Sequence, residues 1–470
     1  MSDWTDQYDQ EIIAETADIV VKDIIHNIFE EKLLIHRNIS LSEFEISLLY
    51  RWPVYVGVNI FINRMLSVIH NKHECLYDTK FENKYFNNTA KAIQAFYYDF
   101  SINYNLFNQL SEIIHNISVK KYTEVFNHEK EQNNLEKVIP SRNYLKRFLK
   151  KAYLYTEDKY IKFYKPDFIG ENSNWFRSIW IFGHCMDFSS HDFNDQFKVI
   201  EGGSRDYLKS NFSNVLSSHI LKICKTLSEE KVYQCTKIFA EFMDRIIPLS
   251  LLEGLPERFQ FYSTMLKEWK IKQVHAFTGF YYNENFKVFA ILARRKGAKL
   301  VGHTHGANNY IKLFYKRANE LYFLDYYTTY GVNKVDSDLQ YIGGENVEFI
   351  PTGSTFFNLI PKWEKLSINI NKFTLLYASG PLMEFSSDLL EISPEKNRIH
   401  RLKILQFIEN LLQKYPGLNI SYKPFPGTYK NDPIKTRLSK WFDQNRIKLD
   451  YTSTIKMYSK VDIVLWDYIS

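Results

Sequence analysis

The sequence contains few cysteines, four in 470 residues, and none of them stands in a CxxC spacing. We therefore expect neither a disulfide framework nor a structural zinc site, and a reducing compartment fits best. The amino-terminal segment MSDWTDQYDQEI is acidic and polar, unlike a secretory signal. Apolar windows such as Val54–Ile62 are too short to cross a bilayer. These features predict a cytoplasmic protein with at most peripheral contact at the inner face of the cytoplasmic membrane.

An excess of charge is also missing, because 60 basic and 54 acidic side chains leave a formal net charge of only +6. No run of Lys and Arg alternates with aromatic residues, and Lys146–Lys151 is interpreted as a solvated helix face. We therefore expect no nucleic-acid partner. Glycine (17) and proline (13) are scarce, whereas hydrophobic residues make up 45% of the chain. This composition is typical of a folded protein with large cores and short loops, divided into two or three domains.

Several catalytic and cofactor motifs are absent. The sequence has no GxGxxG, no GxxxxGK[ST], no GxSxG and no HExxH. A standard dinucleotide site and a P-loop ATPase are therefore not supported, and we expect no bound cofactor.

The sequence divides into three regions with different patterns. Residues 1–155 carry apolar residues at helical spacing, as in Ile12–Ile28 and Phe96–Ile114, and are predicted to form a helical region. Residues 156–345 are predicted to form a first Rossmann-like α/β domain, and residues 346–470 are predicted to form a second one. The overall fold class is α/β.

The strongest α/β pattern begins at residue 273. Gln273–Phe277 is predicted as a strand, Phe286–Lys296 as a helix that ends at Gly297, and Lys299–Gly302 as the next strand. This order is that of a βαβ unit, which requires a parallel sheet. The second region repeats the pattern, with strands predicted at 373–378, 418–422, 447–450 and 462–466.

The last predicted strand, Ile463–Trp466, is followed by only four residues. A doubly wound sheet normally continues with a helix that covers such a strand. Either the helical region covers it or the second domain is incomplete, and we expect truncation.

The segment Gly302–Asn309 follows a predicted strand and would lie at the carboxyl edge of the sheet, where open α/β sheets bind ligands. His303 and His305 would point to the same face if the segment is extended. No third ligand stands at a convincing spacing, so no metal site is expected. The histidines either cap neighbouring backbone groups or contact a ligand, together with Gly306 and Asn308.

Two further loops are candidate donor-binding loops. Ser379 and Gly380 follow a predicted strand and offer small residues to a phosphate. Lys423 and Pro424 follow the next strand, and Lys423 is suited to meet a phosphate. The alternative reading of this second loop is a rigid turn with an exposed lysine.

Two carboxylates are candidate catalytic groups beside His305. Glu284 lies one element before the His-Gly loop, which makes it a candidate base or nucleophile. The preference of helix N-termini for acidic residues explains Glu284 almost equally well. Asp325 is a weaker candidate.

The order of these features resembles that of two-domain GT-B glycosyltransferases. More narrowly, Asn283–Gly306 (NENFKVFAILARRKGAKLVGHTHG) is similar to a segment of bacterial surface-polysaccharide and O-antigen transferases that ends in Gln-His-Gly-Gly. Here Thr304 replaces the Gln and Ala307 the second Gly. The Tyr422–Pro426 segment is similar to the basic-residue-plus-Pro loop that holds the donor phosphate in nucleotide-sugar transferases.

Some relatives in this resemblance use CMP-activated ulosonic acids such as CMP-Kdo, and some are retaining enzymes with a carboxylate nucleophile. The resemblance therefore implies a nucleotide-sugar donor, with a CMP-linked sugar as a candidate, and a glycan or lipid-linked acceptor. It implies that His305 and Gly306 lie at the reacting centre and Lys423 at the phosphate. The alternative hypothesis is a non-catalytic scaffold that recruits partners for polysaccharide assembly.

Overall fold

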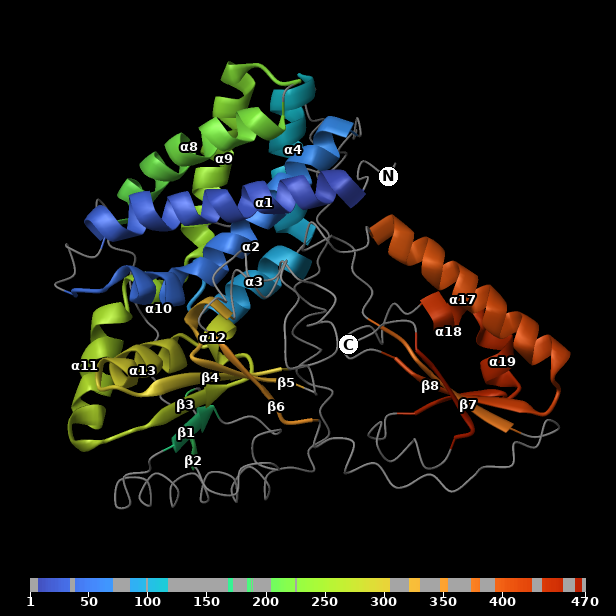
Figure 1. The fold of residues 1–470 in the computed structure, drawn as a ribbon. Coiled ribbons are helices and arrows are strands. Elements are labelled where there is room, and N and C mark those ends of the chain that lie inside the picture. The colour runs from blue at the N-terminus through green and yellow to red at the C-terminus, as the bar shows by residue number, and fades with distance from the viewer. Residues whose placement is uncertain are drawn as a thin grey trace.

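The structure is a computed structural model that describes residues 7–33, 39–70, 85–98, 100–116, 168–171, 184–186, 188, 204–224, 226–304, 321–329, 347–353, 373–380, 394–424, 433–450 and 461–466. In this part of the chain, helices predominate and the strands form parallel sheets (Figure 1). The predicted α/β class is confirmed.

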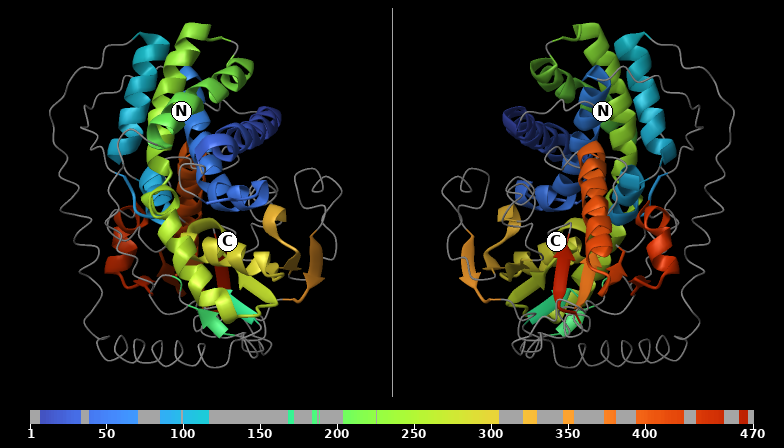
Figure 2. Two further views of the ribbon diagram at one scale, coloured as in Figure 1. Left: turned by 90° about the vertical axis from the view of Figure 1, so that its left-hand side faces the viewer. Right: turned by 90° about the vertical axis from the view of Figure 1, so that its right-hand side faces the viewer.

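A layer of helices lies on one side of the first sheet in all three views (Figure 1, Figure 2). The helices predicted at 12–28 and 96–114 are confirmed within it. The second half of the layer, α8 and α9, packs against α1, α2 and α4. The layer consists of α1 (Gln7–Ile24), the π-helix η1 (Ile25–Leu33), α2 (Glu43–His70), α3 (Thr89–Tyr98), α4 (Phe100–His115), α8 (Ser204–Ile223), α9 (Glu229–Ile246) and α10 (Leu249–Leu252).

Helix α2 is the centre of this layer. By length and composition it could cross a membrane over Glu43–Ile69, but 94% of its apolar window is buried inside the structure. Its buried arginines have partners: Arg51 donates to Asp18 at 2.5 Å, and Arg64 donates to Asn103 at 3.0 Å. Buried charges and amides that pair in this way are expected where helices pack against helices. Its burial is that of a core helix.

The first sheet has the strand order β2-β1-β3-β4-β5-β6, and all its described strand pairs are parallel. The helices that follow α10 pack close to it: α11 (Leu255–Met265), the short η4 (Leu266–Glu268), α12 (Gly279–Tyr282) and α13 (Glu284–Arg295). Its strands are β1 (Phe168–Glu171), β2 (His184–Met186), β3 (Gln273–Ala276), β4 (Lys299–His303), β5 (Tyr326–Thr329) and β6 (Glu348–Pro351), with the 3-10 turn η5 (Leu321–Phe323) before β5.

The predicted βαβ unit is confirmed in β3, α13 and β4. Asn283 caps α13 by accepting a hydrogen bond from the Phe286 N–H at 3.0 Å, and Gly297 follows the helix with φ of 92°. A residue with positive φ at this position is favoured as glycine. The cap and the stop fix the length of α13, and β4 therefore begins in register with β3.

The second sheet has the order β10-β7-β8-β9 and is also parallel. Helix α17 lies along one side of it with α18 and α19 (Figure 1). The strands and helices are β7 (Phe373–Ala378), α17 (Pro394–Lys414), β8 (Leu418–Lys423), α18 (Pro433–Arg437), α19 (Ser439–Asp443), β9 (Ile447–Leu449) and β10 (Ile463–Trp466).

The buried apolar residues form two clusters. One runs from Ala17 to Val347 and joins the helical layer to the first sheet, and the other runs from Phe373 to Ile447. The helical region and the first sheet therefore share a core, whereas the second sheet packs its own. The domain boundaries predicted at 155/156 and 345/346 stay predictions.

A buried ion cluster ties the helical layer together. Arg205 donates to both carboxylate oxygens of Glu253, at 2.7 and 2.8 Å, and its guanidinium stacks on Tyr85. It also contacts Asp244, which accepts a hydrogen bond from the Tyr85 hydroxyl at 2.7 Å. Both carboxylates that face Arg205 are 3% exposed. Glu253 therefore has a structural partner inside the helical layer.

Candidate functional site

The strand order of the first sheet reverses between β1 and β3. The chain runs outward from β1 to β2, then returns to place β3 on the other side of β1. Loops that leave two such strands diverge at the carboxyl edge and open a crevice, which is the usual ligand site of open α/β sheets. His303, at the end of β4, lies near this edge, one strand away from β3.

His303 belongs to a chain of hydrogen bonds across three strands. Its Nε2 lies 3.0 Å from Nδ1 of His275 in β3, and its Nδ1 lies 2.8 Å from the hydroxyl of Thr328 in β5. His275 Nε2 lies 3.0 Å from the side-chain oxygen of Gln273. The Phe277 ring lies 5.1 Å from the ring of His303, between centroids.

The donor and acceptor in each of these hydrogen bonds follow from Gln273, the last group in the series. The Gln273 oxygen only accepts, so His275 donates from Nε2 and, when neutral, accepts at Nδ1. His303 then donates from Nε2 and accepts at Nδ1 from Thr328. An extra proton fits only on Nδ1 of His303, where the Thr328 hydroxyl can turn and accept. The two imidazoles together can therefore carry at most one proton beyond the neutral state.

Both imidazoles are neutral at pH 7. Burial, together with the neighbouring His303, lowers the pKa of His275 to about 3. Burial also lowers the pKa of His303 to about 4. The pair therefore resists protonation in the folded chain.

The other members of the His-Gly loop lie outside the described residues, namely His305, Gly306 and Asn308. The described chain ends just before them at Thr304, which is 3% exposed and whose N–H donates to the Thr328 carbonyl at 3.0 Å. This bond extends the pairing of β4 with β5 by one residue.

Glu284 lies in the interior, 5% exposed, at the first turn of α13. Its carboxylate accepts a hydrogen bond from the backbone N–H of Thr89, the first residue of α3. A carboxylate at that place satisfies an N–H that the helix leaves unpaired. Glu284 thus joins α13 to α3, and its role as base or nucleophile stays a prediction.

Asp325 lies at the opposite edge of the sheet from His303, because it precedes β5 whereas His303 ends β4. Its carboxylate accepts hydrogen bonds from Arg294 at 2.8 Å, from Lys299 at 3.0 Å and from the Leu300 N–H at 2.8 Å. The structure therefore does not bring Asp325 and His303 together.

The strand order of the second sheet also reverses, between β7 and β10. Ser379 and Gly380 follow β7 at this point. The Ser379 N–H donates to the Lys423 carbonyl at 3.0 Å, and the Ser379 hydroxyl lies 3.2 Å from that of Tyr422. Arg401 of α17 donates to the Gly380 carbonyl at 3.0 Å. These bonds hold the loop against the sheet, and phosphate contact by Ser379 and Gly380 stays a prediction.

Lys423 is the last residue of β8 and is half-buried, and Pro424 behind it is buried. Lys423 is the Cα partner of Ala378 in β7, so it lies at the carboxyl edge beside the point where the strand order reverses. The structure thus brings three predicted donor residues, Ser379, Gly380 and Lys423, to one edge.

Comparison with protein families decides the broad class of the chain. The model of the LIC12162 family, described as LIC12162 family transferase, matches residues 4–470. The chain belongs to this family of transferases. No curated protein and no solved structure matches it. A transferase is an enzyme, and in that coarse respect the family agrees with the sequence prediction.

Sequence reasoning missed one residue of this candidate site, His275. The pattern QVHAF predicts its strand, and the alternation of a strand places Gln273 and His275 on one face. The pairing of β3 with β4 then sets His275 beside the strand that ends in His303. The available signal was a histidine at similar depth in two strands expected to be neighbours.

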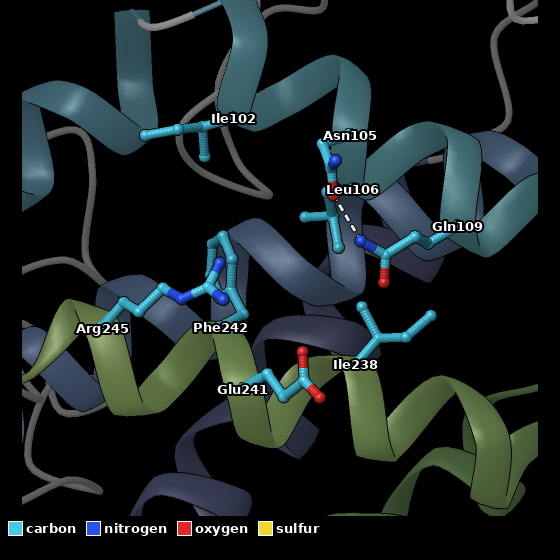
Figure 3. Close-up of a pocket in the computed structure, with 8 residues that line it drawn as sticks. All are labelled: Ile102, Asn105, Leu106, Gln109, Ile238, Glu241, Phe242 and Arg245. Atoms are coloured by element: carbon cyan, nitrogen blue, oxygen red, sulfur yellow. Dashed lines mark hydrogen bonds between the residues drawn. The ribbon is translucent and has the colours of Figure 1, made fainter. Parts of the chain in front are cut away.

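The described residues offer no metal site of their own, and one small cavity lies among the helices. Among them, no group of three or more His, Cys, Asp or Glu side chains is placed to hold a metal ion. A cavity of about 30 Å³ lies between α4 and α9, where Gln109 donates to Asn105 and where Glu241 and Arg245 face it (Figure 3). This volume is about that of one water molecule in the liquid, far below that of a sugar.

Proposed function

We propose that the chain is a glycosyltransferase that moves a sugar from a nucleotide-linked donor to a bacterial surface glycan or a lipid-linked precursor of one. The observation that carries this proposal is the edge of the second sheet. There a lysine and a small-residue loop lie at one carboxyl edge, at the point where the strand order reverses, in a chain of a transferase family. Such an edge is a common nucleotide site.

The two parallel sheets would act as the two halves of a GT-B-like enzyme. The second sheet would hold the donor, with Lys423 at a phosphate, because an ammonium group offsets the charge that the leaving nucleotide gains. The first sheet would face the acceptor. There the imidazole that the sequence places next to the carboxyl edge, that of His305, is suited to accept a proton.

The reaction balances with these roles. The bond between the anomeric carbon and the phosphate oxygen breaks, and its electron pair leaves with the nucleotide. The acceptor oxygen bonds to the anomeric carbon and loses its proton to the imidazole. We propose a CMP-linked sugar as the donor to test first, and the cytoplasmic face of the membrane as the place of reaction.

Calorimetric titration of the purified chain with CMP, UDP and GDP tests the proposal. A nucleotide at a hundredfold excess over its dissociation constant stabilises the folded chain by about 2.7 kcal/mol. Lys423→Met should weaken nucleotide binding about tenfold or more, because hydrogen bonds to charged groups contribute roughly 1.5–3 kcal/mol. Lys448→Met is the matched control, since Lys448 is exposed on β9 of the same sheet. Binding of none of the three nucleotides would overturn the proposal.

A further inference from the structure

Three residues form a row across the carboxyl edge of the second sheet. Trp466 of β10 is the Cα partner of Ala378 in β7, and Ala378 is the Cα partner of Lys423 in β8. Paired residues in parallel strands point to the same face of a sheet. The row therefore places an aromatic ring, a methyl group and an ammonium group side by side, across the point where the strand order reverses.

This face is opposite to the one that α17 covers. Tyr377 and Tyr422, one residue earlier in β7 and β8, stack on each other with ring centroids 5.4 Å apart and belong to the cluster under α17. Alternation along the strands sends Ala378 and Lys423 to the other side. The row thus stands apart from the core of the second sheet.

Trp466 is exposed although its strand is anchored. Its side chain is 47% exposed. At the other end of β10, the Asp462 N–H donates to the Thr374 carbonyl at 2.9 Å and its carboxylate accepts from the Thr374 N–H at 2.8 Å. These two bonds fix the register of β10 on β7. The exposure of a large aromatic ring is therefore a property of the paired strand.

The three side chains of the row follow the order of base, ribose and phosphate in a nucleotide. An exposed indole face can stack on any type of base. A small residue beside it lets a ribose approach the backbone, and the lysine beyond meets a phosphate. Neighbouring strands lie about 4.8 Å apart, so the indole and the ammonium group start about 10 Å from each other.

We propose that Trp466 is the stacking surface for the base of the nucleotide donor, in a row in which Ala378 underlies the ribose and Lys423 meets the phosphate. This inference rests on the proposed function and adds to it the residue that recognises the base. It assigns the base to the β10 side of the edge and the phosphate to the β8 side.

Calorimetry with two ligands that differ only in the base tests the assignment. The ligands are CMP and ribose 5-phosphate, and the proteins are the wild-type chain, Trp466→Leu, Trp466→Phe and Ile463→Ala. Trp466→Leu should weaken CMP binding about tenfold or more and leave ribose 5-phosphate binding unchanged. Trp466→Phe keeps an aromatic face and should retain most of the affinity. Ile463→Ala, at the other end of β10 and 38% exposed, should change neither.

Two results would overturn the inference while the proposed function stands. One is unchanged CMP affinity in Trp466→Leu. The other is an equal loss for CMP and ribose 5-phosphate, which would mean that the substitution disturbs the sheet edge and not base recognition. A wild-type chain that binds no nucleotide at all would overturn the inference and the proposed function together.

Discussion

His275 Nδ1 and His303 Nε2 lie 3.0 Å apart, and the two rings are nearly parallel, with centroids 5.2 Å apart and an interplanar angle of 22°. The rings belong to neighbouring strands and share one face of the first sheet. Because Gln273 and Thr328 occupy the outer nitrogens, every ring nitrogen has a partner when both rings are neutral. The pair is thus built for the uncharged state.

This pair predicts how stability depends on pH. The folded-state pKa values of about 3 and about 4 lie below the ordinary value of 6.5. Between these values the unfolded chain binds more protons than the folded one, so the stabilisation is complete above about pH 6.5 and is lost as pH falls. In urea titrations from pH 7 to pH 5, the free energy of unfolding should fall faster for the wild type than for His275→Gln/His303→Gln. The difference in slope is at most about 1.4 kcal/mol per pH unit for each imidazole.

A control separates this effect from the titration of other histidines. His400 is exposed on α17, so His400→Gln should keep the wild-type slope. Equal slopes for the wild type and the double variant would show that the His275–His303 pair does not resist protonation.

A second prediction separates the two readings of Glu284. Its carboxylate contacts the Thr89 N–H and lies near Lys287, which is fully buried and donates to the Leu49 carbonyl at 3.2 Å. Burial lowers the pKa of Lys287 to about 8, while Glu284 acts to raise it. Glu284→Ala should lower the free energy of unfolding by about 1–3 kcal/mol, because it leaves buried polar groups unpaired.

The double variant Glu284→Ala/Lys287→Met should recover part of that loss, since it removes the buried charge along with its partner. Urea unfolding measures both values. A Glu284→Ala chain of unchanged stability that binds nucleotide but transfers no sugar would instead identify Glu284 as the catalytic group.

The elements that sequence predicts well are those with local causes. Phe373–Ala378 is predicted and found with the same bounds, because an apolar run next to a small-residue loop is a strand signal in itself. Gly297 ends α13 as expected, since its backbone conformation is one that glycine adopts easily. The parallel sheets follow from the spacing of strands and helices.

What sequence could not predict depends on contacts between distant residues. Glu284 meets Thr89 across 195 positions, so its helix-start signal was visible but its partner was not. Asp325 was a weaker catalytic candidate, and the structure shows that it precedes β5 and lies at the edge opposite to His303. The row of Trp466, Ala378 and Lys423 depends on the order β10-β7-β8, which spacing alone does not determine.

A third prediction concerns the buried ion cluster of the helical layer. Arg205→Met leaves Glu253 and Asp244 without the guanidinium that both contact, and each of these side chains is 3% exposed. Removing one partner of a buried pair costs about 3–5 kcal/mol. The urea midpoint should fall accordingly. Lys222→Met, at an exposed position of the same helix α8, should change stability by no more than about 0.5 kcal/mol. Similar small effects from both variants would contradict a structural role for the cluster.

The last prediction tests how tightly β4 packs next to His303. A methyl group at Gly302 would lie 2.3 Å from Leu324 Cδ1 and 2.9 Å from Tyr327 Cδ2. The end of Leu324 can rotate away, but the Tyr327 ring is 2% exposed and held in the core, so Gly302→Ala should cost about 1–3 kcal/mol. Gly297→Ala meets no atom within 4 Å, and only its φ of 92° opposes the substitution, at about 1–2 kcal/mol.

The destabilisation in the two glycine variants has different causes, so different second substitutions should reduce it. Leu324→Ala makes room at Gly302, so the Gly302→Ala/Leu324→Ala double variant should lose less stability than the sum of the single losses, by urea unfolding. The same Leu324→Ala change should add fully to Gly297→Ala, because a strained backbone gains nothing from space. Full additivity at both positions would mean that β4 moves as a unit to accept the methyl group. In that case the position of His303 would not depend on the packing of Gly302.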